Sequence, residues 1–295
     1  MKKLTAITLL LSLFIGYSCK QSSESKDKED TTASENSTLR IVTLNGALTE
    51  TISALGYEEA IVGVDVTSTF PKTVKETATD LGHISSITIE SIMALKPTDV
   101  FATEKDLSPD LKTQLESASV NVHLLKHTYT IDGTKALITD VAKVLEAEGN
   151  VEAIFSSIDT TIDTVEPLNP QPKVVFIYAR GAGTLMLSGN NTPMQQLVAL
   201  AGGEYAITEF DSFKPLTPES LVQANPDVLF LFESGIRSLG GAEGLLTIPG
   251  VAETNAAKDN AIITMDGALV SSFGPRVGLA TKELNELLKK HTAKN

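Results

Sequence analysis

Apolar runs and amphipathic segments alternate along the chain from residue 39 onward. A short apolar run between Gly, Pro or polar residues is typical of a buried strand, and apolar positions three or four residues apart are typical of a helix. The predicted strands are 40–44, 61–65, 99–103, 121–125, 173–179, 227–232 and 261–265. The predicted helices are 50–55, 89–95, 109–118, 193–200, 219–224 and 276–290. Strands alternating with helices favour parallel βαβ units, so the sequence predicts an α/β fold.

The stretch from 133 to 165 departs from this alternation. Its apolar residues lie on one helical face on both sides of Gly149-Asn150, with no strand between them. Prolines from Pro167 onward end the pattern, because proline lacks the N–H that a helix needs. The predicted domains are an N-terminal α/β lobe over 39–148, a long connecting helix over 149–170 and a C-terminal α/β lobe over 171–295.

Two segments, one in each predicted lobe, echo each other. Thr88-Ile89-Glu90 and Thr217-Pro218-Glu219 each open a predicted helix that runs into a proline turn and then into a strand. Two similar, Rossmann-like lobes joined by one helix are the economical interpretation.

The start of the chain carries an export signal. Lys2 and Lys3 precede an apolar run over 4–15, which is too short to span a bilayer and is typical of a signal peptide. We predict that residues 1–18 are this signal peptide. No later run reaches 18 apolar residues, so we expect no transmembrane helix in the mature protein.

Cys19 is the only cysteine of the chain and directly follows the predicted signal peptide. This arrangement resembles a bacterial lipoprotein signal, which implies a lipid on Cys19 and a periplasmic protein anchored to a membrane. The alternative is an unmodified cysteine beside a cleaved secretory signal. Residues 19–38 are mostly serine, threonine and charged residues, so we expect a flexible tether.

Composition and motifs argue against several classes of function. The formal net charge of −13 argues against nucleic acid as a partner, since phosphates require a basic surface. The chain has no HExxH, CxxC or GxSxG motif and no phosphate-binding GxxxxGK[ST] loop. We therefore expect a binding protein with no catalytic cofactor and not an enzyme. A doubly wound α/β enzyme is the remote alternative.

Five segments of the chain are RIVTLNGALTETISALGYEEAIVGVDVTSTFP, LGHISSITIESIMALKPTDVFAT, GTLMLSGNNTPMQQLVALAGG, FKPLTPESLVQANPDVLFL and FGPRVG. Together, and in this order, they resemble the solute-binding proteins of ATP-driven importers for haem, vitamin B12 and ferric siderophores, and most closely the haem-binding branch. The resemblance implies two lobes with the ligand in the cleft between them. It also implies haem as the transported ligand, a permease and its ATPase as partners, and a monomer. Cobalamin or a ferric siderophore is the alternative ligand.

The resemblance also suggests residues for the N-terminal side of the site. Haem-binding relatives usually place a tyrosine after a glycine where this chain has Gly82-His83, which makes His83 a candidate iron ligand. A solvated loop histidine is the alternative. Phe70 replaces another common tyrosine; it could pack on a porphyrin face or serve as an ordinary core residue.

On the C-terminal side, Tyr178 is a candidate second iron ligand, and Arg180 could form a bidentate pair with a haem propionate. A surface ion pair is the alternative for Arg180. Further pocket candidates are Ser272, Phe273 and Arg276.

Glu90 and Glu219 match the glutamates with which the family docks onto its permease. Each also opens a helix, where a carboxylate complements the helix dipole, so the two roles stay open.

Overall fold

The computed structural model describes residues 38–292. The predicted signal peptide, Cys19 and nearly all of the predicted tether lie outside the described residues.

The N-terminal lobe is built on a five-stranded, wholly parallel sheet with the order β3-β2-β1-β4-β5. Its strands are β1 (Ile41–Thr43), β2 (Ile61–Val64), β3 (Thr79–Asp80), β4 (Asp99–Thr103) and β5 (Asn121–Leu125). Its helices are α1 (Gly46–Ile52), α2 (Lys72–Thr77), α3 (Ile89–Met93), α4 (Pro109–Ser117) and α5 (Ile131–Val144). Helices α1 and α5 contribute to one apolar core, and α3 and α4 contribute to another. The parallel α/β expectation is confirmed for this lobe.

The C-terminal lobe has a mixed sheet with the order β11-β10-β6-β7-β9, and β8 also pairs with β6. Its strands are β6 (Lys173–Ala179), β7 (Leu185–Ser188), β8 (Glu204–Tyr205), β9 (Phe213–Pro215), β10 (Val228–Phe232) and β11 (Ile262–Met265). Strands β7 and β9 are antiparallel and were not predicted; β7 turns back on β6 because the Arg180 amide donates to the carbonyl oxygen of Thr184 (2.9 Å).

The helices of this lobe are α7 (Pro193–Leu200), α8 (Pro218–Ala224), α9 (Glu233–Ser238), α10 (Ala242–Leu246), α11 (Asn255–Lys258), α12 (Gly267–Ser272) and α13 (Val277–Thr292). Together with the mixed sheet they enclose one apolar core, which includes Phe176, Phe230 and Leu284. The molecule is therefore a two-lobed α/β protein, as the sequence predicts.

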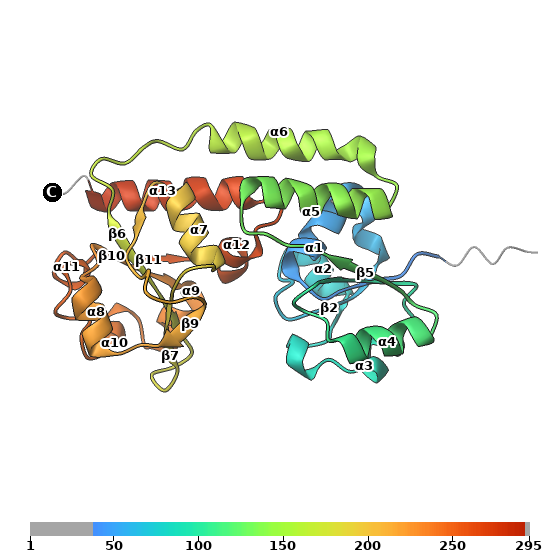
Figure 1. Ribbon diagram of the computed structural model, residues 1–295, viewed down its shortest axis with the longest axis horizontal. Helices are drawn as coiled ribbons and strands as arrows, with labels where there is room; N and C mark the ends of the chain where they lie inside the picture. The colour runs from blue at the N-terminus through green and yellow to red at the C-terminus, as the bar shows by residue number, and fades with distance from the viewer. Residues whose placement is uncertain (1–37, 293–295) are drawn as a thin grey trace, which may run out of the picture. The chain divides into compact units, whose positions relative to one another are not determined.

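The connecting helix α6 (Val151–Ile162) is shorter than the predicted 149–170. The chain leaves the helix ahead of Pro167, and the Asn285 side chain accepts from the Glu166 amide (3.3 Å) and donates to its carbonyl oxygen (2.8 Å). Helix α6 runs alongside both α13 and α5, which lie end to end (Figure 1). A Cβ on Gly278 of α13 would lie 3.0 Å from the carbonyl oxygen of Ile158, so glycine permits this close approach of the two helices.

The echo between the two lobes is a repeated helix start. Thr88 caps α3 and Thr217 caps α8, and in both helices a serine three residues later completes a capping box. Each box places a glutamate, Glu90 or Glu219, in an exposed first turn.

Candidate functional site

The carboxyl ends of the parallel strands carry the polar loops of the N-terminal lobe. In open α/β sheets, ligands bind at this edge, where neighbouring connections leave in opposite directions; here that point lies between β1 and β4. Asn45 follows β1 and donates to Asp106 beyond β4 (2.9 Å), and Thr103 donates to the same carboxylate (2.5 Å). These bonds fix the two loops beside each other.

The loop after β2 is built around the buried Asp65. Its carboxylate accepts from the Thr67 hydroxyl (2.6 Å) and the Ser68 hydroxyl (2.7 Å), and Ser68 also bonds Thr49 of α1 (2.6 Å). Burial raises the pKa of Asp65, and the bonds from Thr67 and Ser68 oppose this rise. The Val66 amide then donates to the Gly82 carbonyl oxygen (2.9 Å), which ties this loop to the segment of His83.

His83 lies at this edge with an exposed side chain and caps the single helical turn Ile84–Ser86. Its Nδ1 atom is 2.9 Å from the Ser85 hydroxyl and 3.3 Å from the Ser85 amide. Within residues 38–292 no hydrogen bond to Nε2 of His83 is formed, so this atom is available to a ligand.

An aromatic cluster occupies the corresponding edge of the C-terminal lobe. The half-buried Tyr178 near the end of β6 meets Phe213 of β9 and Phe232 of β10 edge to face, at centroid distances of 6.2 and 6.3 Å. We call Tyr178, Phe213 and Phe232 the aromatic wall. Arg180 follows directly on β6 and is exposed, and its guanidinium forms no ion pair with any described residue.

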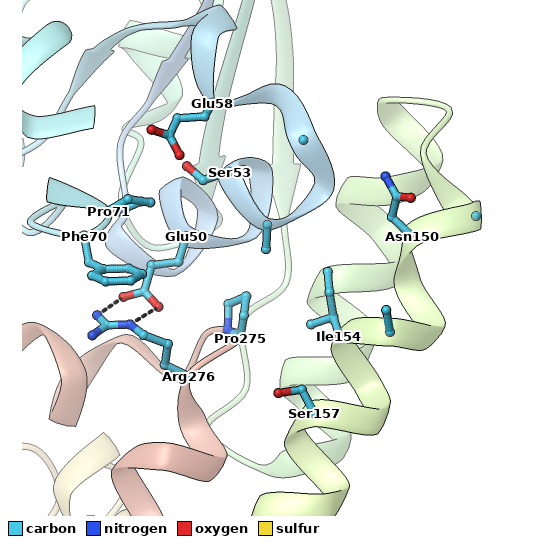
Figure 2. A pocket seen from close by; sticks show the side chains of 14 residues that line it. Glu50, Ser53, Glu58, Phe70, Pro71, Asn150, Ile154, Ser157, Pro275 and Arg276 are labelled. Atoms are coloured by element: carbon cyan, nitrogen blue, oxygen red, sulfur yellow. Dashed lines mark hydrogen bonds and ion pairs between the residues drawn. The ribbon is translucent and has the colours of Figure 1, made fainter. Parts of the chain in front are cut away.

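Phe70 and Arg276 come together with Glu50 beside a cavity of about 690 Å³ (Figure 2). Arg276 donates to both carboxylate oxygens of Glu50 (2.9 and 2.5 Å), and its guanidinium carbon lies 3.8 Å from the centroid of the Phe70 ring. Burial raises the pKa of the Glu50 carboxyl, while the hydrogen bond and the charge of Arg276 oppose this rise. The charge of Arg276 is thus already paired inside the protein.

Phe273 is 1% exposed and packs against Tyr129 of the other lobe, with ring centroids 5.6 Å apart. Its φ of 47° is left-handed, and its carbonyl oxygen accepts from Thr134 (2.9 Å) and lies 3.3 Å from Nε2 of His127. Ser272, next to it, is also buried. This segment is therefore a contact point between the lobes.

Sequence reasoning passed over His127 and Tyr129, which line a cavity of about 50 Å³ together with Asn45, Lys105 and Asp106. Burial lowers the pKa of His127, and the bond to Phe273 opposes this effect. The signal in the sequence was the position of His127 just past the end of a strand that neighbours β4.

Glu90 and Glu219 are exposed at the first turns of α3 and α8. Hydrogen bonds from the Thr88 side chain and from its own amide lower the pKa of Glu90. A further cavity of about 700 Å³ adjoins Glu90 and includes Ser85 and Asp106 in its lining.

The structure brings together some of the predicted residues. Phe70 and Arg276 share one cavity wall, with Ser272 and Phe273 just before Arg276 in the chain. His83, Tyr178 and Arg180 each lie at the carboxyl edge of their own lobe, and no contact joins His83 to the other two among the described residues. Likewise, within the described part of the chain, no group of three or more His, Cys, Asp or Glu side chains could hold a metal ion.

Two α/β lobes that share a helical connection and carry their exposed polar and aromatic side chains at the strand ends define a bilobal solute-binding protein. The family model of the periplasmic binding proteins matches residues 41–269, and the chain belongs to this family. Its members are substrate-binding proteins, so the expectation of a non-enzyme is confirmed. Within residues 38–292, no helix is long and apolar enough to cross a membrane.

Three known proteins illustrate the similarity. The apo structure of the periplasmic haem-binding protein RhuT from Roseiflexus sp. RS-1 is 33% identical, with a TM-score of 0.82, and the match covers 86% of this chain and 99% of RhuT. The uncharacterized ABC transporter substrate-binding lipoprotein YvrC of Bacillus subtilis is 25% identical over 86% of this chain and 81% of its own length. A cobalamin-binding protein of Halobacterium salinarum is 24% identical over 81% of this chain and 66% of its own length.

Proposed function

We propose that this protein captures haem between its two lobes and delivers it to the permease of an ABC importer. The observation that carries this proposal is the aromatic wall with Arg180 directly beside it at the end of β6. The likeness to the haem-binding RhuT supports the same ligand.

The aromatic wall suits a flat apolar macrocycle. Tyr178 and Phe232 offer large apolar surfaces with few rotatable bonds, and the β-sheet holds both residues in place. A haem bound here would place its propionates within the region of Arg180, whose planar guanidinium can pair with a carboxylate through two hydrogen bonds.

His83 would supply the iron ligand from the other lobe. Neutral imidazole binds iron through one nitrogen when the second nitrogen carries the proton. Iron binding through Nε2 requires the proton to sit on Nδ1, which would then donate to the Ser85 hydroxyl, 2.9 Å away, instead of accepting from the Ser85 amide, 3.3 Å away. Tyr178 is the candidate for the second axial position.

Absorbance titration of the purified protein with haemin, cobalamin and a ferric siderophore in parallel tests the ligand. We expect saturable binding of haemin with a shifted Soret band, and a different Soret position in His83→Ala. His291→Ala, in the terminal helix, is the matched control and should leave the spectrum as in the wild type. A protein that saturates with either other ligand and not with haemin would overturn the proposal.

Cobalamin is the second candidate, because a cobalamin-binding protein is among the relatives. The absence of tryptophan from the chain favours haem over the larger corrin ligand. The same titration separates the two.

The remaining parts of the proposal rest on the resemblances found in the sequence. We propose that Glu90 and Glu219 dock onto the permease, that Cys19 carries the lipid anchor in the periplasm, and that the protein is a monomer. Reversal of both glutamates to lysine should abolish stimulation of the importer's ATPase while haemin binding persists. Mass spectrometry of the mature chain and analytical ultracentrifugation check the lipid and the monomer.

The lobe boundaries, 39–148 and 171–295, also stay predictions. Limited proteolysis should cut first between α6 and β6, where most residues are exposed, if these boundaries are right.

A further inference from the structure

Glu50 forms a buried ion pair with Arg276 of the other lobe. It lies on α1 of the N-terminal lobe with a side chain 3% exposed, and Arg276 precedes α13 of the C-terminal lobe with a side chain 20% exposed. Both carboxylate oxygens accept from the guanidinium. A bidentate pair of this kind fixes orientation as well as distance.

Phe70 extends this pair toward the ligand edge of the N-terminal lobe. Phe70 is 39% exposed, and the centroid of its ring lies 3.8 Å from the central carbon of the Arg276 guanidinium (Figure 2). The loop before Phe70 begins at Asp65, whose carboxylate accepts from the hydroxyls of Thr67 and Ser68. Ser68 also bonds a threonine of α1, so the loop is held against this helix. An arginine of one lobe therefore helps to place a loop of the other.

The same loop is joined to the segment of His83. The Val66 amide donates to the Gly82 carbonyl oxygen, one residue before His83. Arg276 is thus linked to the candidate iron ligand by its contact with Phe70, by the backbone from Phe70 back to Val66, and by the hydrogen bond from Val66 to Gly82.

The other side of Arg276 is tied down as well. Three residues earlier in the chain, the Phe273 carbonyl oxygen accepts from Thr134 and lies within reach of His127, both of the N-terminal lobe. The turn that carries Arg276 therefore cannot shift relative to α5 without breaking buried hydrogen bonds.

We propose that Glu50 and Arg276 are positioning residues that set the spacing between the two halves of the ligand site, with Phe70 as the link to the N-terminal loops. We call Glu50, Phe70 and Arg276 the interlobe clamp. The proposal rests on the proposed function, in which a ligand is held from both lobes at once. It also gives Arg276 a role other than direct contact with a propionate, since its Nε and Nη2 atoms already donate to Glu50.

Spin-label distance measurements on the whole chain test the clamp without any ligand. Labels at Asp110→Cys on α4 and Glu243→Cys on α10, both exposed sites, report the separation of the lobes in a Cys19→Ser background. We expect one narrow distance distribution for the intact clamp and a broader one in Glu50→Gln and in Arg276→Met. Arg276→Lys, which keeps the charge but not the planar fork, should be intermediate.

Phe70→Leu is a second test of the clamp that should leave folding intact, because this exposed side chain contributes little to the core. We expect it, too, to broaden the distance distribution. Glu116→Gln, which removes one partner of the exposed pair with Lys112, is the matched control and should change neither the distance distribution nor haemin binding. Haemin affinity should fall about tenfold in Glu50→Gln, a coupling of ordinary size.

Unchanged distance distributions in Glu50→Gln and Phe70→Leu would overturn the clamp, whatever the haemin titration gives. A wild-type protein that takes up no haemin overturns the proposed function, and the distance measurement then still decides whether the clamp sets the spacing.

Discussion

The two lobes present different chemistry at equivalent edges of their sheets. The edge of the N-terminal lobe consists of polar loops. They are held by the hydroxyl groups that donate to Asp65 and by the hydrogen bond from Asn45 to Asp106. The edge of the C-terminal lobe is the aromatic wall, made possible by the antiparallel strand β9 that brings Phe213 beside Tyr178. The two lobes therefore share an architecture, but their ligand edges differ in chemistry.

This difference suggests a division of roles under the proposed function. The C-terminal lobe would supply apolar area and a cation, and the N-terminal lobe would supply the iron ligand on a loop fixed by buried hydrogen bonds. The clamp would then hold the two contributions at one spacing.

The largest expected effect concerns the cores on which these edges rest. Phe176→Ala in β6 and Phe101→Ala in β4 each remove a fully buried ring and should cost about 3–5 kcal/mol of unfolding free energy. Phe176 should lie at the upper end, because it also packs on Phe230 and Phe232 (centroids 5.2 and 4.7 Å apart). Urea unfolding followed by circular dichroism measures both. Losses below about 1 kcal/mol would contradict the burial of these rings.

The next effect isolates the aromatic wall. Tyr178→Ala should weaken haemin binding by about 2 kcal/mol, or roughly 30-fold, the usual size for a central aromatic contact. Val66→Ala on the opposite edge, a 42% exposed side chain, should cost much less. Equal losses in the two variants would remove the proposed difference between the edges.

Tyr178→Phe sharpens this test. If Tyr178 only packs on the haem, Tyr178→Phe should bind haemin with unchanged affinity and an unchanged Soret band. If its hydroxyl is an axial ligand, the Soret band of the variant's complex should shift. Absorbance spectra of the haemin complexes distinguish the two roles.

A smaller effect comes from the contact between the lobes at His127. Because burial lowers its pKa, the folded state holds this imidazole neutral at pH values where the unfolded chain already binds a proton. Stability should therefore fall as pH drops below about 6.5, by at most about 1.4 kcal/mol per pH unit. Asp106, which favours the proton, and Lys105, which opposes it, are the charged groups that act on this ring.

His127→Gln should flatten this part of the pH profile in chemical denaturation series. The control is His123→Gln, whose ring bonds Asp99 within the N-terminal lobe. A profile that keeps its slope in His127→Gln would assign the pH dependence to another group.

The smallest effect tests what the lobes share. Thr88→Ala and Thr217→Ala each remove a helix cap and should each cost about 1 kcal/mol. Similar losses in thermal unfolding would show that the two capping boxes are equivalent, and a clear inequality would show that they are not.

The sequence predicted the long elements well and the short ones poorly. The β6 run Lys173–Ala179 and the α7 helix stand out by their apolar pattern, whereas α1 (Gly46–Ile52) begins before the predicted helix 50–55. Strand β7, by contrast, has only four residues and is stabilised by its antiparallel pairing with β6. Local pattern carries little information about such pairing.

The connecting helix was predicted too long for a related reason. Its apolar pattern continues to Val165, but Pro167 and the Asn285 bonds favour extended backbone there. The pair of Glu50 with Arg276 joins residues 226 positions apart, and no spacing rule identifies it from the sequence. Candidate site residues could thus be found one loop at a time, whereas the contacts between lobes required the structure.

The close approach at Gly278 also bears on how the chain reaches its final form. Helix α6 contacts α5, which precedes it, and α13, which follows it by more than 100 residues, so the part of its apolar face that packs on α13 stays uncovered until α13 has been synthesised. The N-terminal lobe can complete its own parallel sheet well before that moment. Docking of α13 on α6 would then complete the contact between the two helices. A chain without α13 would expose the apolar residues of α6 that pack on it, beside an N-terminal lobe that is already folded.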